Sequence, residues 1–105
     1  MIKLNRFDEF GPNMGLPSMK DFFSKDRYPN QDLIVDYLRN KGKATLVHMN
    51  RPKDVFTGEY IECENVAMND GKYSWNLALA YYVEKYNLQL NQDFIKHVLK
   101  QTTIL

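Results

Sequence analysis

The chain has 105 residues, 44% of them hydrophobic and 26% charged, which predicts a single globular domain over residues 1–105 rather than a disordered chain. Its 14 basic and 13 acidic residues leave a net charge of +1, without the broad positive field typical of nucleic-acid-binding domains. The single cysteine excludes an internal disulfide, and no apolar run reaches the roughly 20 residues that span a bilayer. We therefore expect a cytoplasmic protein without a signal peptide, whose direct partner is neither a nucleic acid nor a membrane.

The N-terminal residues 1–28 are expected to be largely irregular, because "FGPNMGLPSM" contains two glycines and two prolines. Ser18 is a suitable cap for one short helix through Phe22 and Phe23. Apolar side chains such as Phe7 indicate that this segment lies across the domain instead of extending into solvent.

The first long helix is predicted for "PNQDLIVDYLRNK", residues 29–41. Acidic residues lie near its start and basic residues near its end, which favours the helix dipole. Its apolar residues recur at helical spacing and mark a face toward the core: Leu33, Ile34, Tyr37 and Leu38. Gly42 follows and is expected to end the helix in the left-handed conformation.

The period then changes to that of strands. Residues 43–50, "KATLVHMN", are rich in β-branched and apolar residues and predict a strand, and residues 59–69, "EYIECENVAMN", predict a second. The intervening loop is bracketed by Pro52 and Gly58. "NDG" at 69–71 is a strong hairpin signal, after which "KYSW" is either a short third strand or the entry to the next helix.

Two further helices are predicted at residues 76–87 and 91–101, the first capped by Ser74 or Asn76 and the second by Asn91. The fold class is therefore α+β, with a small three- to four-stranded antiparallel sheet packed against three to four helices. One face of the 76–87 helix is expected to pack on the sheet, and its residues fall at helical spacing: Trp75, Ala78, Leu79, Tyr82, Val83 and Tyr86.

A tyrosine and alternate glutamates share one face of the predicted second strand. They can form the solvated side of the sheet, or an acidic patch with a tyrosine anchor suited to a cationic protein partner. An apolar residue and a tyrosine, four positions apart, lie off the core face of the following helix and contact either an internal neighbour or a partner. The residues predicted to contact a partner are Glu59, Tyr60, Glu62, Glu64, Asp70, Leu77 and Tyr81.

Catalytic chemistry has little support in the sequence. His48 and His97 are the only histidines and could act as an acid–base pair, but each is more simply explained as a polar residue, His97 exposed and His48 partly buried. Cys63 could face His48 if the two predicted strands pair, although a small buried cysteine is the simpler interpretation. We expect no catalytic residues, no metal site and no cofactor, because no metal-ligand spacing and no glycine-rich phosphate loop is found.

Four segments carry a family resemblance: "LPSMKDFF", "YPNQDLIVDYLRNKGK", "TGEYI" and "NDGKYSWNLALAYYVEKYNLQLNQDFIKHVL". Their order, over most of residues 16–99, resembles the small bacterial immunity proteins of contact-dependent growth-inhibition and polymorphic-toxin systems. The resemblance implies an antitoxin that is not an enzyme and that acts by occluding a cognate toxin domain. The expected toxin is a nuclease. Two alternatives remain: a small RNase or hydrolase that uses His48 and His97, and an oligomeric regulatory or structural module that associates through Leu77 and Tyr81.

Overall fold

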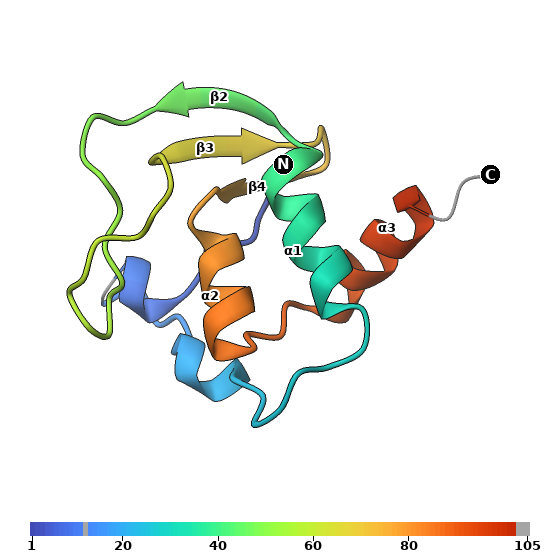
Figure 1. Cartoon of the computed structure of the whole chain (residues 1–105), viewed down its shortest axis with the longest axis horizontal. Coiled ribbons are helices and arrows are strands. Elements are labelled where there is room, and N and C mark those ends of the chain that lie inside the picture. Colours follow the sequence, from blue (N-terminus) through green and yellow to red (C-terminus); the bar gives the residue numbers. More distant parts are fainter. Residues whose placement is uncertain (12, 103–105) are drawn as a thin grey trace.

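A computed structural model describes residues 1–11 and 13–102, which form an α+β fold (Figure 1). Four strands and three α-helices are joined by short 3₁₀ turns and by one longer loop between the second and third strands. In chain order the elements are β1 (Ile2–Lys3), η1 (Asp8–Phe10), η2 (Met19–Phe22), α1 (Gln31–Asn40), β2 (Lys43–Val47), β3 (Val66–Asn69), β4 (Tyr73–Asn76), α2 (Leu79–Tyr86) and α3 (Gln92–Thr102).

The four strands form one sheet in the order β1-β4-β3-β2, which confirms the predicted class and strand number. β2, β3 and β4 pair antiparallel, and the predicted "NDG" hairpin joins the last two. β1 runs parallel to β4, so the sheet is mixed instead of wholly antiparallel. The reason is that Ile2 and Leu4, in a segment expected to be irregular, donate backbone hydrogen bonds to Lys72 and Ser74 over 2.9 and 2.8 Å.

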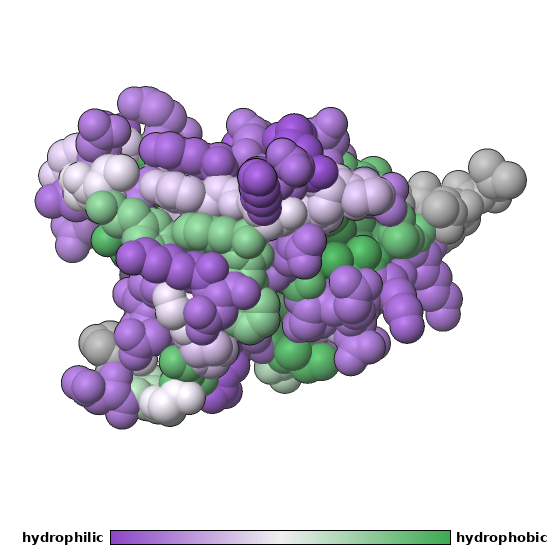
Figure 2. All heavy atoms as spheres, turned by 90° about the horizontal axis from the view of Figure 1, so that it is seen from below, coloured by the Kyte–Doolittle hydropathy of each residue, from purple (hydrophilic) through white to green (hydrophobic). Residues whose placement is uncertain are grey.

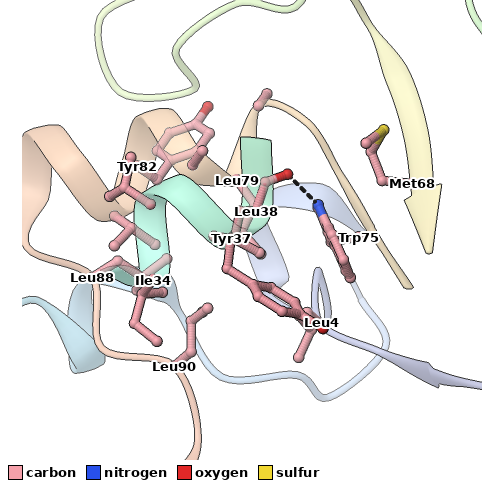
Figure 3. Packing of buried hydrophobic residues seen from close by; sticks show 14 of the residues in the cluster. Leu4, Ile34, Tyr37, Leu38, Met68, Trp75, Leu79, Tyr82, Leu88 and Leu90 are labelled. Atoms are coloured by element: carbon pink, nitrogen blue, oxygen red, sulfur yellow. Dashed lines mark hydrogen bonds between the residues drawn. The ribbon is translucent and has the colours of Figure 1, made fainter. Parts of the chain in front are cut away.

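The core lies between the sheet and the helices, because β3 and β4 alternate strictly between buried and half-buried residues. Trp75 of β4 is 3% exposed, and its indole N–H donates a 2.9 Å hydrogen bond to the Leu38 carbonyl at the end of α1 (Figure 3). α1 in turn packs on α2 and α3. The predicted aromatic face of residues 75–86 is thus largely core, although Trp75 belongs to a strand and the helix begins only at Leu79.

Gly42 serves close packing and not helix termination. The left-handed conformation expected there is wrong: Lys41, with φ −97°, is the C-cap of α1, and Gly42 is not among the glycines with positive φ. A Cβ atom at position 42 would lie 2.8 Å from Cζ2 of Trp75 and 3.1 Å from the Asn69 carbonyl oxygen. The strand after α1 can therefore pass over the indole ring only because residue 42 has no side chain.

The predicted strand 59–69 is wrong over its first seven residues, since β3 begins at Val66. Residues 59–65 form part of a loop whose backbone groups pair within it: Asp54 N–H donates to the Glu59 carbonyl and Ile61 N–H to the Pro52 carbonyl, over 2.8 and 2.9 Å. Ile61 is also buried, at 3% exposure, beneath this loop. The alternation of Tyr60 with glutamates therefore occurs without any strand ladder.

Two predicted helix caps form, at Ser18 and Asn91, whereas the cap predicted at Ser74 or Asn76 is wrong, because both residues belong to β4 and the N-cap of α2 is Ala78. Ser18 Oγ accepts from the Lys20 N–H at the start of η2, and Asn91 Oδ1 accepts from the Phe94 N–H at the start of α3. Residues before α1 cross the domain as expected and bury Leu4, Phe7 and Met19.

No helix in the described ranges is both long and apolar enough to cross a membrane. Seen from below, hydrophilic residues cover most of the surface and apolar residues form a broken band among them (Figure 2).

Candidate functional site

Residues 52–61, here called the anchored loop, are fastened to α2 through the carboxylate of Asp54. This side chain is 1% exposed and lies between the loop and the helix. Two tyrosine hydroxyls and two backbone N–H groups donate to it, at 2.7 Å from Tyr81, 2.6 Å from Tyr86, 2.7 Å from Phe56 and 3.2 Å from Thr57. One buried carboxylate thus closes the turn of the loop and attaches it to the fold.

The same contacts determine the ionisation of Asp54. Burial by itself raises the pKa of the carboxyl, but the hydrogen bonds from Tyr86, Tyr81 and the two backbone N–H groups outweigh it and lower the pKa below its ordinary value. Lys85 Nζ lies 3.6 Å from Oδ2 of Asp54. Burial, together with the hydrogen bond to Asp54, raises the pKa of Tyr86 to about 12. Asp54 is therefore a carboxylate, and the tyrosines are neutral donors, at neutral pH.

A third tyrosine of α2 holds the loop through its backbone. The hydroxyl of Tyr82 accepts a 3.0 Å hydrogen bond from the Val55 N–H and donates a 3.1 Å hydrogen bond to the Lys53 carbonyl. In Figure 3 its ring belongs to the core while the hydroxyl points away from the labelled core residues. The three tyrosines of α2 therefore have two tasks, since their rings pack in or against the core and their hydroxyls fix the loop.

A groove with a volume of about 600 Å³ lies beside the anchored loop. Five of the seven residues predicted to contact a partner line it, although they come from the loop, from the end of β4 and from α2. The lining residues are Arg39, Glu59, Tyr60, Ile61, Glu62, Cys63, Leu77, Tyr81 and Glu84. Glu64, which was predicted to share a face with Tyr60 and Glu62, is exposed but is not among them.

The charges around the groove are mixed, where the sequence predicted an acidic patch. Three glutamates and one arginine in the lining leave a net charge of −2, and Arg39 pairs with Glu84 at 2.9 Å. On the other side, Arg51 and Lys53 lie 5.2 and 4.9 Å from the ring centroid of Tyr60. Tyr60 remains 58% exposed, so much of its ring is accessible to solvent between the negatively charged groove and the two cationic side chains.

Asp70, the other predicted contact residue outside the groove, belongs to a separate cluster between the β3–β4 turn and the helices. Its Oδ2 accepts a 2.5 Å hydrogen bond from the Tyr37 hydroxyl and lies 2.8 Å from Nε2 of His97. Burial raises the pKa of this carboxyl, but the bonds from Tyr37, from two backbone N–H groups and from His97 prevail and lower it to about 2. With its side chain 7% exposed, Asp70 offers little surface to a partner.

The interpretation of His97 as an exposed residue is wrong, because its side chain is 14% exposed and contacts Asp70. Asp70 is the orienting group that the sequence did not reveal, since the two residues are 27 positions apart. His48, in contrast, is exposed. Its backbone N–H donates to the Asn65 carbonyl, at the end of the β2–β3 ladder opposite the hairpin that carries Asp70. At about 3.3 Å per residue the two ends are roughly 15 Å apart, so the fold does not assemble the histidine pair.

Cys63 does not face His48 either, because the strand that would place them opposite each other does not form. Burial raises the pKa of its thiol, which disfavours the nucleophilic thiolate. Among residues 1–11 and 13–102, no group of three His, Cys, Asp or Glu side chains is arranged to hold a metal ion. Comparison of the chain with protein-family models, with curated proteins and with solved structures finds no match.

Proposed function

We propose that this protein is a cytoplasmic immunity protein that binds a cognate bacterial toxin domain and occludes it, and that the groove beside the anchored loop is where the toxin docks. The proposal is supported by the resemblance of residues 16–99 to such proteins and by one observation in particular. Tyr60 is 58% exposed on a loop that the buried Asp54 fixes to α2.

A loop held in this way suits tight binding. Because its backbone is already ordered by bonds to Asp54 and Tyr82, little conformational entropy remains to be lost when a partner docks. An exposed tyrosine gives large contact area with few rotatable bonds and is frequent among residues that dominate binding energy. The groove carboxylates complement basic groups, which a toxin that cleaves nucleic acid uses to bind phosphates.

Co-expression with the product of the neighbouring upstream gene, the expected toxin, tests the proposal. We expect the two chains to co-purify as a stable complex at micromolar concentration, and cells that express the toxin to survive only with the antitoxin present. A toxin variant without activity should bind equally well, because occlusion does not depend on catalysis. Absence of a complex together with unrelieved toxicity would contradict the proposed function.

The groove itself is tested by exchanging Glu59 and Glu62 for lysine together, and Glu64 for lysine alone as a matched control. Both glutamates of the pair line the groove, whereas Glu64 is exposed outside it. The double exchange should abolish protection in cells, and the control should retain it. Protection that survives the double exchange would place the docking surface elsewhere.

A further inference from the structure

We propose that the free edge of β2 is a second interaction surface, which accepts an extended acidic segment of a partner protein as an added strand. β2 is the last strand of the sheet and pairs only with β3. His48 N–H donates inward to the Asn65 carbonyl over 2.8 Å. Because successive backbone groups of a strand alternate in direction, the N–H and carbonyl of Val47 point to the open side. Figure 1 shows β2 as the outermost strand, on the side of the sheet away from β4.

The side chains at this edge are apolar to an extent unusual for an unpaired strand. Every residue of β2 is exposed. Leu46 is 57% exposed, Val47 63% and Met49, just beyond the strand, 100%. An added strand would cover these side chains as well as the open backbone groups, which is how peptides bind sheet edges in other proteins.

The charge of the edge selects the occupant. Residues 41–53, "KGKATLVHMNRPK", contain no carboxylate. Of their four cationic residues, Lys41 and Lys43 lie just before and at the start of β2, whereas Arg51 and Lys53 lie over the Tyr60 ring. A strand with acidic residues would complement these two lysines, whereas two copies of the edge would bring four lysines together. The occupant is therefore a partner with carboxylates next to β-forming apolar residues, and not a second copy of this chain.

A nucleic acid fits the surface less well than an acidic peptide. Single strands bound on a sheet stack their bases on exposed aromatic rings. The outward residues of β3 and β4 are Ala67, Asn69, Ser74 and Asn76, all half-buried and none aromatic, while Trp75 is 3% exposed on the core side.

The first half of β2 carries features that prevent unselective pairing. The β2–β3 register shifts between Ala44 and Leu46, so Thr45 has no partner residue in the ladder and bonds to β3 through its hydroxyl, which donates to the Ala67 carbonyl over 3.2 Å. Bulges and edge lysines both prevent unselective addition of strands to a sheet edge. The β2 edge has both, because the bulge follows Ala44 and Lys43 is the first residue of the strand. The open part of the edge is thus short, from Leu46 to Met49, and the lysine before the bulge requires a carboxylate opposite it.

Nuclear magnetic resonance titration with two synthetic peptides tests this assignment. One is a blocked heptapeptide of alternating glutamate and valine, and the other replaces each glutamate by lysine. The acidic peptide should give saturable amide shifts centred on residues 46–49, with binding at least about tenfold tighter than the lysine peptide. Equal binding of both, or no saturation at millimolar concentration, would overturn the proposal. Preferential shifts with a single-stranded RNA oligomer, or a dimer in light scattering, would overturn it in favour of another occupant.

Val47→Pro provides the matched variant, because proline removes an N–H that points to the open side and breaks no bond of the sheet. Affinity for the acidic peptide should fall at least about tenfold, while Val47→Thr should change it less than about twofold.

Should Val47→Pro fail to fold, Lys41→Glu combined with Lys43→Glu keeps the test decisive by inverting the peptide preference. Unchanged affinity in the folded proline variant, or an unchanged preference in the lysine variant, would refute the edge as the site. The peptides do not involve the groove at Tyr60, so this outcome is independent of toxin binding.

Discussion

The hydroxyl of Tyr81 on α2 donates a 2.7 Å hydrogen bond to the buried carboxylate of Asp54, and so joins the helix with the richest aromatic content to a surface loop. The same tyrosine lines the groove beside that loop. The contact that orders the loop therefore also shapes the surface that the loop presents, which under the proposed function is the recognition surface.

Asp54→Ala should destabilise the protein by about 3 kcal/mol, because it leaves the hydroxyls of two half-buried tyrosines and two backbone N–H groups without their acceptor. Tyr81→Phe removes one donor of four and should cost about 1 kcal/mol. Urea unfolding at pH 7 measures both, with the exposed Asp26→Ala as the control that should change little. A loss below about 1 kcal/mol for Asp54→Ala would mean that the loop is not held by this carboxylate.

Asp70 should make stability depend on acid pH. Its pKa is about 2 in the folded chain and 3.8 ordinarily, so its ionised form stabilises the fold above about pH 4, and this contribution is lost as pH falls through 2. The shift corresponds to about 2 kcal/mol. The difference in unfolding free energy between the natural chain and Asp70→Asn should shrink by about that amount from pH 5 to pH 2. A difference independent of pH would contradict the contacts of Asp70 with Tyr37 and His97.

Gly42→Ala should cost about 1–3 kcal/mol, since its Cβ would lie 2.8 Å from the Trp75 ring. A smaller ring should relieve the contact. In a double-mutant cycle with Trp75→Phe, the two losses should therefore sum to more than the loss measured for the double variant. Strictly additive losses would show that the glycine is needed for another reason.

Charge reversal at the groove should act on the rate of association. Glu62→Lys is expected to slow toxin binding, and Glu64→Lys to slow it less, because only Glu62 lines the groove and pairs with Arg51 at 3.4 Å. Stopped-flow measurements at two salt concentrations separate the two variants. Equal rates for Glu62→Lys and the natural chain would remove the groove carboxylates from the steering of the partner.

The sequence predicts the parts of this fold that local chemistry determines. Helices 29–41 and 91–101, the Asn91 cap and the "NDG" hairpin all follow from period, capping and turn residues, and each is confirmed within two residues. The error at 59–65 has a physical cause. Tyrosine alternating with glutamate has the period of a strand, whereas the bonds that fix this loop join Asp54 to Tyr81 and Tyr86, which lie 27 and 32 positions further along the chain.

Long-range polar contacts are likewise invisible to periodicity. Nothing in the spacing of Asp70 and His97 indicates that they meet, because the hairpin and α3 come together through long-range packing such as that of Tyr73 against Phe94. β1 is too short to give any periodic signal, and its pairing with β4 depends on the chain crossing the sheet. Five predicted contact residues nevertheless line one groove. Helical spacing predicted that two of them, Leu77 and Tyr81, lie off the core face and so remain accessible at the surface.

The most direct measurement is the dissociation constant of the toxin domain for Tyr60→Ala, with Val55→Ala, another exposed apolar residue of the same loop, as its control. The ring of Tyr60 is exposed outside the core cluster and contacts the Arg51 and Lys53 cations, so the free energy of unfolding in urea should fall by only about 1 kcal/mol. Toxin binding should weaken about 30-fold, or about 2 kcal/mol. Binding that stays within about twofold of the natural chain, with the fold intact, would contradict the assignment of the anchored loop as the recognition element.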